Sequence, residues 1–118
     1  MPTDTLKDRL SRGSEITITV TGRKSGRAIS IPVWFVLEGD TLYLVAVEGS
    51  DTQWYQNVLK NRTIRIDARG AQAEFQALPI TDVARVSAVV EKFRDKYGAR
   101  DVKRYYSKLD VAVLVQIG

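Results

Sequence analysis

The fold of this 118-residue chain is decided by residues 21–61, which read TGRKSGRAISIPVWFVLEGDTLYLVAVEGSDTQWYQNVLKN. The stretch begins with a basic loop at 21–27 that has a glycine near each end. Two apolar segments follow at 28–37 and 41–47, and the Glu-Gly-Asp turn between them predicts a hairpin. A short aromatic helix is expected at 52–60. We expect the remaining residues to complete a barrel around these elements.

Both strands of this predicted hairpin are apolar on both faces. In the first strand, Ile31 and Phe35 lie on one face and Trp34 and Val36 on the other. Strands of this kind need cover on both sides. The barrel core provides one cover, and a helix, a second subunit or a flat ligand must provide the other. Pro32 cannot donate a ladder hydrogen bond, so it marks an edge or a bulge where a ligand can approach the backbone.

The rest of the chain adds four strands and three helices to this stretch. Alternating apolar residues such as Ile16 and Ile18 predict half-buried strands, and hairpin links imply antiparallel pairing. Further strands are expected at 15–20, 63–68, 71–77 and 111–117, and further helices at 4–12, 81–97 and 100–106. We therefore predict a mainly β, α+β fold. It is a single domain over residues 1–118, a six-stranded antiparallel β-barrel with flanking helices.

The composition is typical of a globular domain, with 44% hydrophobic and 27% charged residues. No apolar run approaches the roughly 20 residues that span a bilayer, so no membrane span is expected. The N-terminus lacks the basic start and apolar core of a signal peptide. The chain also has no cysteine for the disulfides of exported proteins. These features predict a cytoplasmic protein.

The absence of histidine and cysteine excludes several kinds of catalytic site. There can be no Ser-His-Asp triad, no cysteine nucleophile, and no zinc or haem held by those residues. No tight cluster of Asp and Glu is visible, so no metal site is predicted. Any chemistry is expected to belong to a bound organic cofactor.

The basic loop carries Arg23, Lys24 and Arg27 with no acidic residue between them. Glycine allows a sharp turn and exposes backbone N–H donors. Arginine makes paired contacts to anionic oxygens, and lysine supplies a point charge. The loop therefore suits phosphate or carboxylate groups. The alternative is an exposed turn whose charges only keep the chain soluble.

A second basic cluster lies near the C-terminal end, and the net charge of the chain is +4. We interpret this cluster as solvated helix faces. Two basic clusters would also allow nucleic-acid binding, but no recognisable motif accompanies them, so no nucleic-acid partner is expected. The residues of the second cluster are Lys92, Arg94, Lys96, Arg100, Lys103 and Arg104.

The aromatic helix has a broad apolar face made by the pairs Trp54–Val58 and Tyr55–Leu59. Asn57 is expected outside this face or at its margin. On spacing alone, a Trp-Tyr pair is more often part of a core than of a cofactor stack. The tyrosines of the tail are interpreted as anchors whose hydroxyls reach the surface, with one or two available to line a pocket. They are Tyr97, Tyr105 and Tyr106.

The order and spacing of these segments resemble the deazaflavin-dependent nitroreductase family. The resemblance covers about residues 16–66 and implies the split β-barrel fold shared with FMN-binding flavoproteins. Family members bind the deazaflavin coenzyme F-420 and pass hydride from its reduced form to quinones, nitro compounds or other acceptors. The matching runs are TGRKSGR at 21–27, IPVWF at 31–35, LYLVA at 42–46 and WYQNV at 54–58, followed by Lys60-Asn61.

The resemblance also implies which residues bind the cofactor. Those expected at its phosphate and acidic tail are Arg23, Lys24, Ser25, Gly26 and Arg27. Those expected around the deazaflavin ring are Pro32, Val33, Ala46, Trp54 and Asn57. Tyr97 would fall on the side of the electron acceptor. No catalytic side chain is named, because the hydride comes from the cofactor.

We therefore hypothesise an oxidoreductase that uses coenzyme F-420, or alternatively FMN, and a small-molecule electron acceptor of the quinone or nitro type. Two other hypotheses stay open at this point. One is a non-catalytic cofactor-binding protein, and the other is a structural split-barrel dimer. Split barrels of this type commonly pair, and the second apolar faces of 28–37, 41–47 and 111–117 offer an interface. A homodimer is therefore expected.

Overall fold

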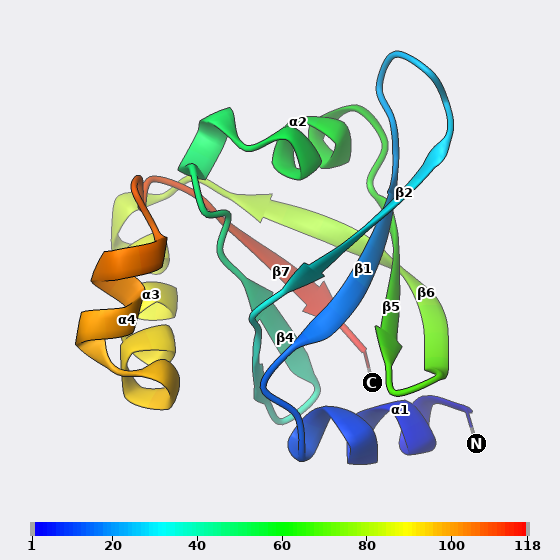
Figure 1. Ribbon diagram of the computed structural model, residues 1–118, viewed down its shortest axis with the longest axis horizontal. Helices are drawn as coiled ribbons and strands as arrows, with labels where there is room; N and C mark the ends of the chain where they lie inside the picture. Colours follow the sequence, from blue (N-terminus) through cyan, green and yellow to red (C-terminus); the bar gives the residue numbers. More distant parts are fainter. Residues whose placement is uncertain (1, 118) are drawn as a thin grey trace.

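The computed structural model describes residues 2–117, and its strands form a single curled antiparallel sheet (Figure 1). The described sheet has seven strands in the order β2-β1-β5-β6-β7-β4-β3, so the predicted number of six is wrong. The fold class, mainly β with flanking helices, is as predicted. The strands are β1 (Ile16–Thr21), β2 (Ala28–Val33), β3 (Val36–Glu38), β4 (Thr41–Leu44), β5 (Thr63–Ala68), β6 (Ala71–Ile80) and β7 (Ala112–Gln116).

The extra strand arises because the predicted strand at 28–37 is broken at Trp34 and Phe35. Its first part, β2, pairs with β1, whereas its second part, β3, pairs with β4. β2 and β3 are therefore the two edges of the sheet, and the predicted hairpin is correct only for the β3–β4 half. Since Val33 and Val36 are three residues apart, these edges lie within about 11 Å of each other. The sheet must curl into a half-barrel to bring them together.

The longest strand, β6, joins the two halves of the curled sheet. Its residues 71–76 pair with β5, and its residues 77–80 pair with β7. This strand crosses Figure 1 from α3 to the hairpin above α1.

The barrel interior holds one apolar core. The alternation of β1 is as predicted, with Ile16, Ile18 and Val20 buried and Thr17 exposed. Burial of such side chains stabilises the folded state by about 25 cal/mol for each Å² of apolar surface removed from water. The largest fully buried side chains of this core are Tyr55, Phe35, Leu6, Leu10, Ile18, Leu42, Leu44, Ile64 and Ile66.

Within residues 2–117, four helices cover the half-barrel (Figure 1). α1 (Pro2–Ser11) closes one end and buries Leu6 and Leu10 in the core. α2 (Gln53–Lys60) lies at the opposite end, preceded by the 3-10 turn η1 (Gly49–Asp51). α3 (Val83–Tyr97) and α4 (Ala99–Tyr105) pack on the outside of the sheet over a second apolar cluster.

Helix α2 differs from its prediction in two positions. Asn57, predicted at the margin, is 4% exposed, and Leu59, predicted on the apolar face, is 44% exposed. The helix is rotated so that an amide, not a leucine, faces inward, because the basic loop supplies hydrogen-bond partners for the amide. No helix of the described residues is long and apolar enough to cross a membrane.

Candidate functional site

Two cavities meet at Trp54, at the end of the half-barrel that α2 covers. The first, here called the basic cavity, has a volume of about 360 Å³. The second, here called the aromatic cavity, has a volume of about 340 Å³. The basic cavity is lined by Gly22, Arg23, Lys24, Ser25, Ile29, Ile31, Gln53, Trp54 and Asn57. The aromatic cavity is lined by Glu15, Pro32, Val33, Trp34, Val45, Val47, Trp54, Tyr105 and Tyr106.

The basic loop is closed by its own backbone. The Gly22 N–H donates to the Arg27 carbonyl at 2.8 Å, and the Gly26 N–H donates to the Gly22 carbonyl at 2.9 Å. Gly26 has a φ of 71°, a conformation that favours glycine. The loop therefore folds as a tight turn between β1 and β2 and directs Arg23 towards α2.

Arg23 is fixed against α2 by two neutral side chains, Asn57 and Gln53. Its guanidinium donates to the Asn57 Oδ1 and to the Gln53 Oε1, both at 2.8 Å. Among the described residues, neither Arg23 nor Lys24 has an ion pair with a carboxylate, and no residue lining the basic cavity is acidic. The cavity is therefore positively charged and uncompensated, which favours an anionic ligand.

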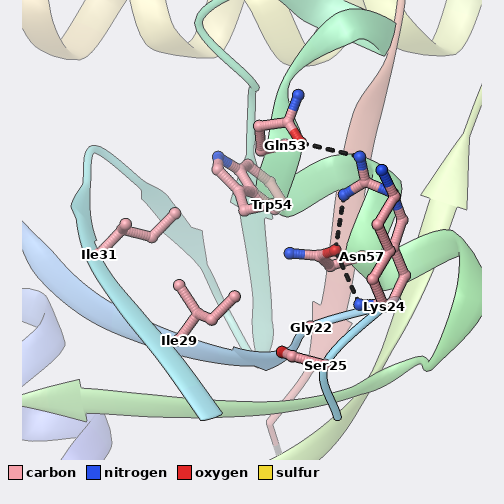
Figure 2. A pocket seen from close by; sticks show the side chains of 9 residues that line it. Gly22, Lys24, Ser25, Ile29, Ile31, Gln53, Trp54 and Asn57 are labelled. Carbon is pink, nitrogen blue, oxygen red and sulfur yellow. Dashed lines mark hydrogen bonds between the residues drawn. The ribbon is translucent and has the colours of Figure 1, made fainter. Parts of the chain in front are cut away.

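Asn57 has one end of its amide free for a ligand. Its Oδ1 accepts from both the backbone N–H and the side chain of Arg23, at 3.1 and 2.8 Å, which fixes the orientation of the amide. The Nδ2 group then points away from Arg23 into the space between Trp54 and Ile29, as Figure 2 shows. No hydrogen bond of this nitrogen is formed within the described residues. Asn57 thus offers a donor inside the cavity.

The aromatic cavity is shaped by Trp34. Its indole stacks on Tyr97, with ring centroids 4.3 Å apart and planes 7° apart. It also meets the Tyr105 ring edge-on at 5.5 Å. Flat apolar walls of this kind suit a planar ring system.

Tyr97 does not line either cavity but supports the wall of the aromatic one. Its hydroxyl accepts from the Phe35 N–H at 3.1 Å and lies within donating distance of the Phe35 and Ser14 carbonyls. Lys96 donates to the same Phe35 carbonyl at 2.8 Å, with its ammonium 3.7 Å from the Phe35 ring centre. Burial raises the pKa of Tyr97 to about 12, and desolvation lowers the pKa of Lys96. The hydrogen-bonding capacity of the Tyr97 hydroxyl is therefore used by backbone groups.

The structure brings together most of the residues named from the sequence. Pro32 and Val33 line the aromatic cavity and Trp54 lines both. Gly26 and Arg27 lie in the exposed part of the loop, and Ala46 is fully buried beside the site. Four predicted residues line only the basic cavity: Arg23, Lys24, Ser25 and Asn57.

Sequence reasoning missed Gln53 and Trp34 as site residues. Gln53 precedes Asn57 by four positions, so the helical spacing would have placed both on one face. Trp34 gave no such signal, because its role depends on the break between β2 and β3. Among the described residues, no group of three or more acidic side chains could hold a metal ion.

Comparison with protein-family models identifies one match, which spans residues 7–114. The family is described as "Uncharacterized protein conserved in bacteria (DUF2255)". A comparison with curated protein sequences gives no match.

Solved structures share the fold. A structure titled F-420-H2-dependent reductase (FDR-A) has a TM-score of 0.68 at 22% identity, over 87% of this chain and 94% of that chain. A pyridoxamine 5'-phosphate oxidase candidate from Listeria innocua has a TM-score of 0.70 at 12% identity, over 98% and 92%. A structure titled domain-swapped dimer has a TM-score of 0.69 at 21% identity, over 98% and 100%. At these identities the similarity shows the fold, that of split-barrel proteins.

Proposed function

The chain belongs to the DUF2255 family of proteins conserved in bacteria, and we propose that it is an oxidoreductase that uses a flavin-type cofactor. In this proposal hydride passes from reduced coenzyme F-420, or alternatively reduced FMN, to a small-molecule acceptor of the quinone or nitro type. The protein binds and orients both partners, and the cofactor supplies the hydride.

One observation carries the proposal: an aromatic cavity and an uncompensated basic cavity share Trp54 as a common wall. Cofactors of this type combine a flat ring with an anionic tail, so they need both surfaces next to each other. Two of the solved structures with this fold are titled as an F-420-H2-dependent reductase and as a candidate pyridoxamine 5'-phosphate oxidase, which supports cofactor-dependent redox chemistry.

The residues of the basic cavity fit an anionic tail. Arg23 is held in place by Asn57 and Gln53, so little side-chain entropy remains to be lost when an anion binds. Lys24 and Ser25 are exposed at the mouth of the cavity and add a charge and a hydroxyl donor. Gly26 and Arg27 belong to the rim of the same loop. The free Nδ2 of Asn57 suits a carbonyl or phosphate oxygen of the ligand.

The residues around the aromatic cavity fit the ring. The Pro32 and Val33 segment belongs to the edge strand β2, whose outer side is open for the approach of a ligand to the backbone. Ala46 is buried next to this wall, where its side chain is small and apolar. Tyr97 supports Trp34 and is therefore a positioning residue, not a group that touches the acceptor.

Turnover tests the catalytic part of the proposal. The natural chain is mixed anaerobically with reduced F-420, or with reduced FMN, and a water-soluble quinone, and reoxidation of the cofactor is followed by its absorbance. Two electrons and one proton leave the cofactor as hydride, and a solvent proton completes the hydroquinone. We expect reoxidation faster than in the protein-free mixture with one of the two cofactors. Cofactor binding without faster reoxidation would instead identify a non-catalytic binding protein.

A second candidate function is that of a structural dimer. It is favoured by the exposure of apolar side chains at the cavity mouths, where Ile29 is 39% and Val47 is 47% exposed. One similar structure is titled as a domain-swapped dimer. We propose that the chain forms a homodimer that covers these side chains. Light scattering at micromolar concentration checks this, and a monomer mass would contradict it.

A further inference from the structure

The link between the edge strands β2 and β3 is a bend in a continuous strand pattern, not a turn. Side chains alternate across it without interruption. Val33, Phe35 and Leu37 pack in the inner core, whereas Trp34 and Val36 pack in the second apolar cluster under α3 and α4. Such alternation is typical of extended backbone. The chain therefore keeps the side-chain order of a strand while it passes from one sheet edge to the other.

Nothing within the link itself requires the bend. Residues 28–38 contain no glycine. Among the described residues, Arg69 is the only non-glycine with a positive φ, and no backbone hydrogen bond closes a turn at 33–36. Trp34 and Phe35 can therefore adopt the extended backbone of an ordinary strand without strain.

The bend is held from outside, by the C-terminal end of α3. The Tyr97 hydroxyl accepts from the Phe35 N–H at 3.1 Å, and the Lys96 ammonium donates to the Phe35 carbonyl at 2.8 Å. The Tyr97 ring also stacks on Trp34. These contacts of Lys96 and Tyr97 with the link are here called the α3 clasp. The balance between a bent and a straight link depends on this clasp.

A straight link carries residues 2–33 away from the rest of their own chain. These residues form α1, β1, β2 and the basic loop, and are here called the N-terminal unit. The unit pairs β1 with β5, buries Leu6 and Leu10 in the core, and donates from Arg23 to α2. None of these contacts involves the link. The N-terminal unit of a second copy can therefore form all of them.

We propose that two copies of this chain exchange their N-terminal units, and that the α3 clasp sets the balance between the closed chain and the exchanged dimer. In the exchanged dimer, β2 and β3 join into one strand over 28–38 that passes from one copy to the other. Exchange of this kind re-forms contacts that the chain already makes, so it needs no newly evolved surface. The inference rests on the proposed homodimer and deepens it by naming how the two copies are joined.

Exchange builds each basic cavity from two chains. Arg23, Lys24 and Ser25 belong to the N-terminal unit, whereas Gln53 and Asn57 belong to α2. Arg23 of one copy then holds the two amides of the other copy in place. An anionic ligand in this cavity contacts both copies.

A disulfide between β1 and β5 reports which chain supplies each N-terminal unit. Thr19 and Arg65 are direct partners in this register, and the natural chain has no cysteine. The variant Thr19→Cys/Arg65→Cys is oxidised at low and at high micromolar concentration and run on a denaturing gel without reductant. A closed chain gives a cross-linked monomer, and an exchanged dimer gives a covalent dimer. The two single-cysteine variants are the controls, and light scattering gives the mass of each sample in solution.

We expect a covalent dimer whose share rises with protein concentration. Lys96→Met, added to the double-cysteine variant, removes one contact of the clasp and should raise the ratio of dimer to monomer about tenfold. The matched control is Lys103→Met, which removes the same charge from an exposed position on α4 that has no ion pair within the described residues. This control should leave the ratio unchanged.

The outcomes separate this inference from the proposed homodimer. A dimer mass in solution with only monomers on the gel would overturn the exchange and leave the homodimer standing. A monomer mass with only monomers on the gel would overturn both. A dimer band of equal strength in the single-cysteine variants, or one that Lys96→Met and Lys103→Met change equally, would also contradict the inference.

Discussion

The indole of Trp34 lies face to face with the ring of Tyr97, 4.3 Å away, although 63 positions separate them in the sequence. Trp34 stands at the link between the edge strands β2 and β3, and Tyr97 is the last residue of α3. The end of α3 thus holds in place the link through which the chain passes from one sheet edge to the other. The same stacking contact holds Trp34 in the wall of the aromatic cavity.

The hydroxyl of Tyr97 is predicted to contribute to stability independently of the ring. Tyr97→Phe keeps the stack on Trp34 but leaves the buried Phe35 N–H without its acceptor. We expect this change to lower the free energy of unfolding by about 1–3 kcal/mol, measured by urea denaturation. The matched control is Tyr105→Phe, whose hydroxyl forms no hydrogen bond within the described residues and which should stay within about 0.5 kcal/mol. Equal effects of the two changes would contradict the assignment.

Stability is predicted to fall at alkaline pH because of buried tyrosines. Burial raises the pKa of Tyr97 from 10.0 to about 12, and burial also raises the pKa of Tyr55 and Tyr106. Above pH 10 the unfolded chain loses these phenol protons while the folded chain keeps them, so the free energy of unfolding decreases as pH rises from 10 to 12. Urea denaturation across this range should show the decrease. Tyr97→Phe should make the profile shallower, and a flat profile in the natural chain would contradict the account.

Asn57 is predicted to have two separable roles. Asn57→Asp keeps an oxygen for Arg23 but removes the free donor and adds a negative charge to the basic cavity. Asn57→Leu removes both functions. We expect the leucine variant to lose about 1–3 kcal/mol of unfolding free energy and the aspartate variant clearly less, because the latter keeps Arg23 paired. Both should bind F-420 or FMN more weakly in a fluorescence titration. Unchanged affinity in the aspartate variant would remove Asn57 from the ligand site.

Gly49 is predicted to be the glycine least tolerant of substitution. Its φ is 55°, and a Cβ at this position would stand 2.8 Å from the Lys108 carbonyl and collide with the Asp110 carboxylate. Gly39 has a similar φ of 62° but open space around it. Gly39→Ala should therefore cost about 1–2 kcal/mol for the backbone conformation alone, and Gly49→Ala a further 1–3 kcal/mol, roughly, for the collision. Thermal denaturation of the two variants measures the difference, and equal losses would contradict it.

The strands that alternate cleanly could be predicted from the sequence. Ile16 and Ile18 of β1, and Ile64 and Ile66 of β5, are buried as their spacing indicated. The break at Trp34 was predicted only in part. Pro32 marked an edge or a bulge, and it does lie in the edge strand β2, but no local signal showed that the chain passes from one sheet edge to the other. The break depends on Tyr97 and Lys96, which reach Phe35 from the far end of the chain.

The candidate site was predictable where charge and turn chemistry coincide, as at Arg23 and Lys24. The site was not predictable where a polar side chain is buried because a residue distant in the sequence supplies its hydrogen-bond partner. Asn57 lies inside because Arg23, 34 positions away, satisfies its oxygen. Tyr97 fits the same pattern, since its hydroxyl is occupied by backbone groups that spacing alone could not identify.

The central claim, that the joined cavities hold a ring and its anionic tail, is tested most directly by a fluorescence titration with coenzyme F-420 and, in parallel, FMN. The natural chain is compared with the double variant Arg23→Gln/Lys24→Gln and with Lys60→Gln/Arg62→Gln, which loses the same charge elsewhere. We predict salt-sensitive binding of one cofactor, weakened about tenfold or more in the first variant and little changed in the second. Binding of neither cofactor, or equal affinity in all three proteins, would contradict the account.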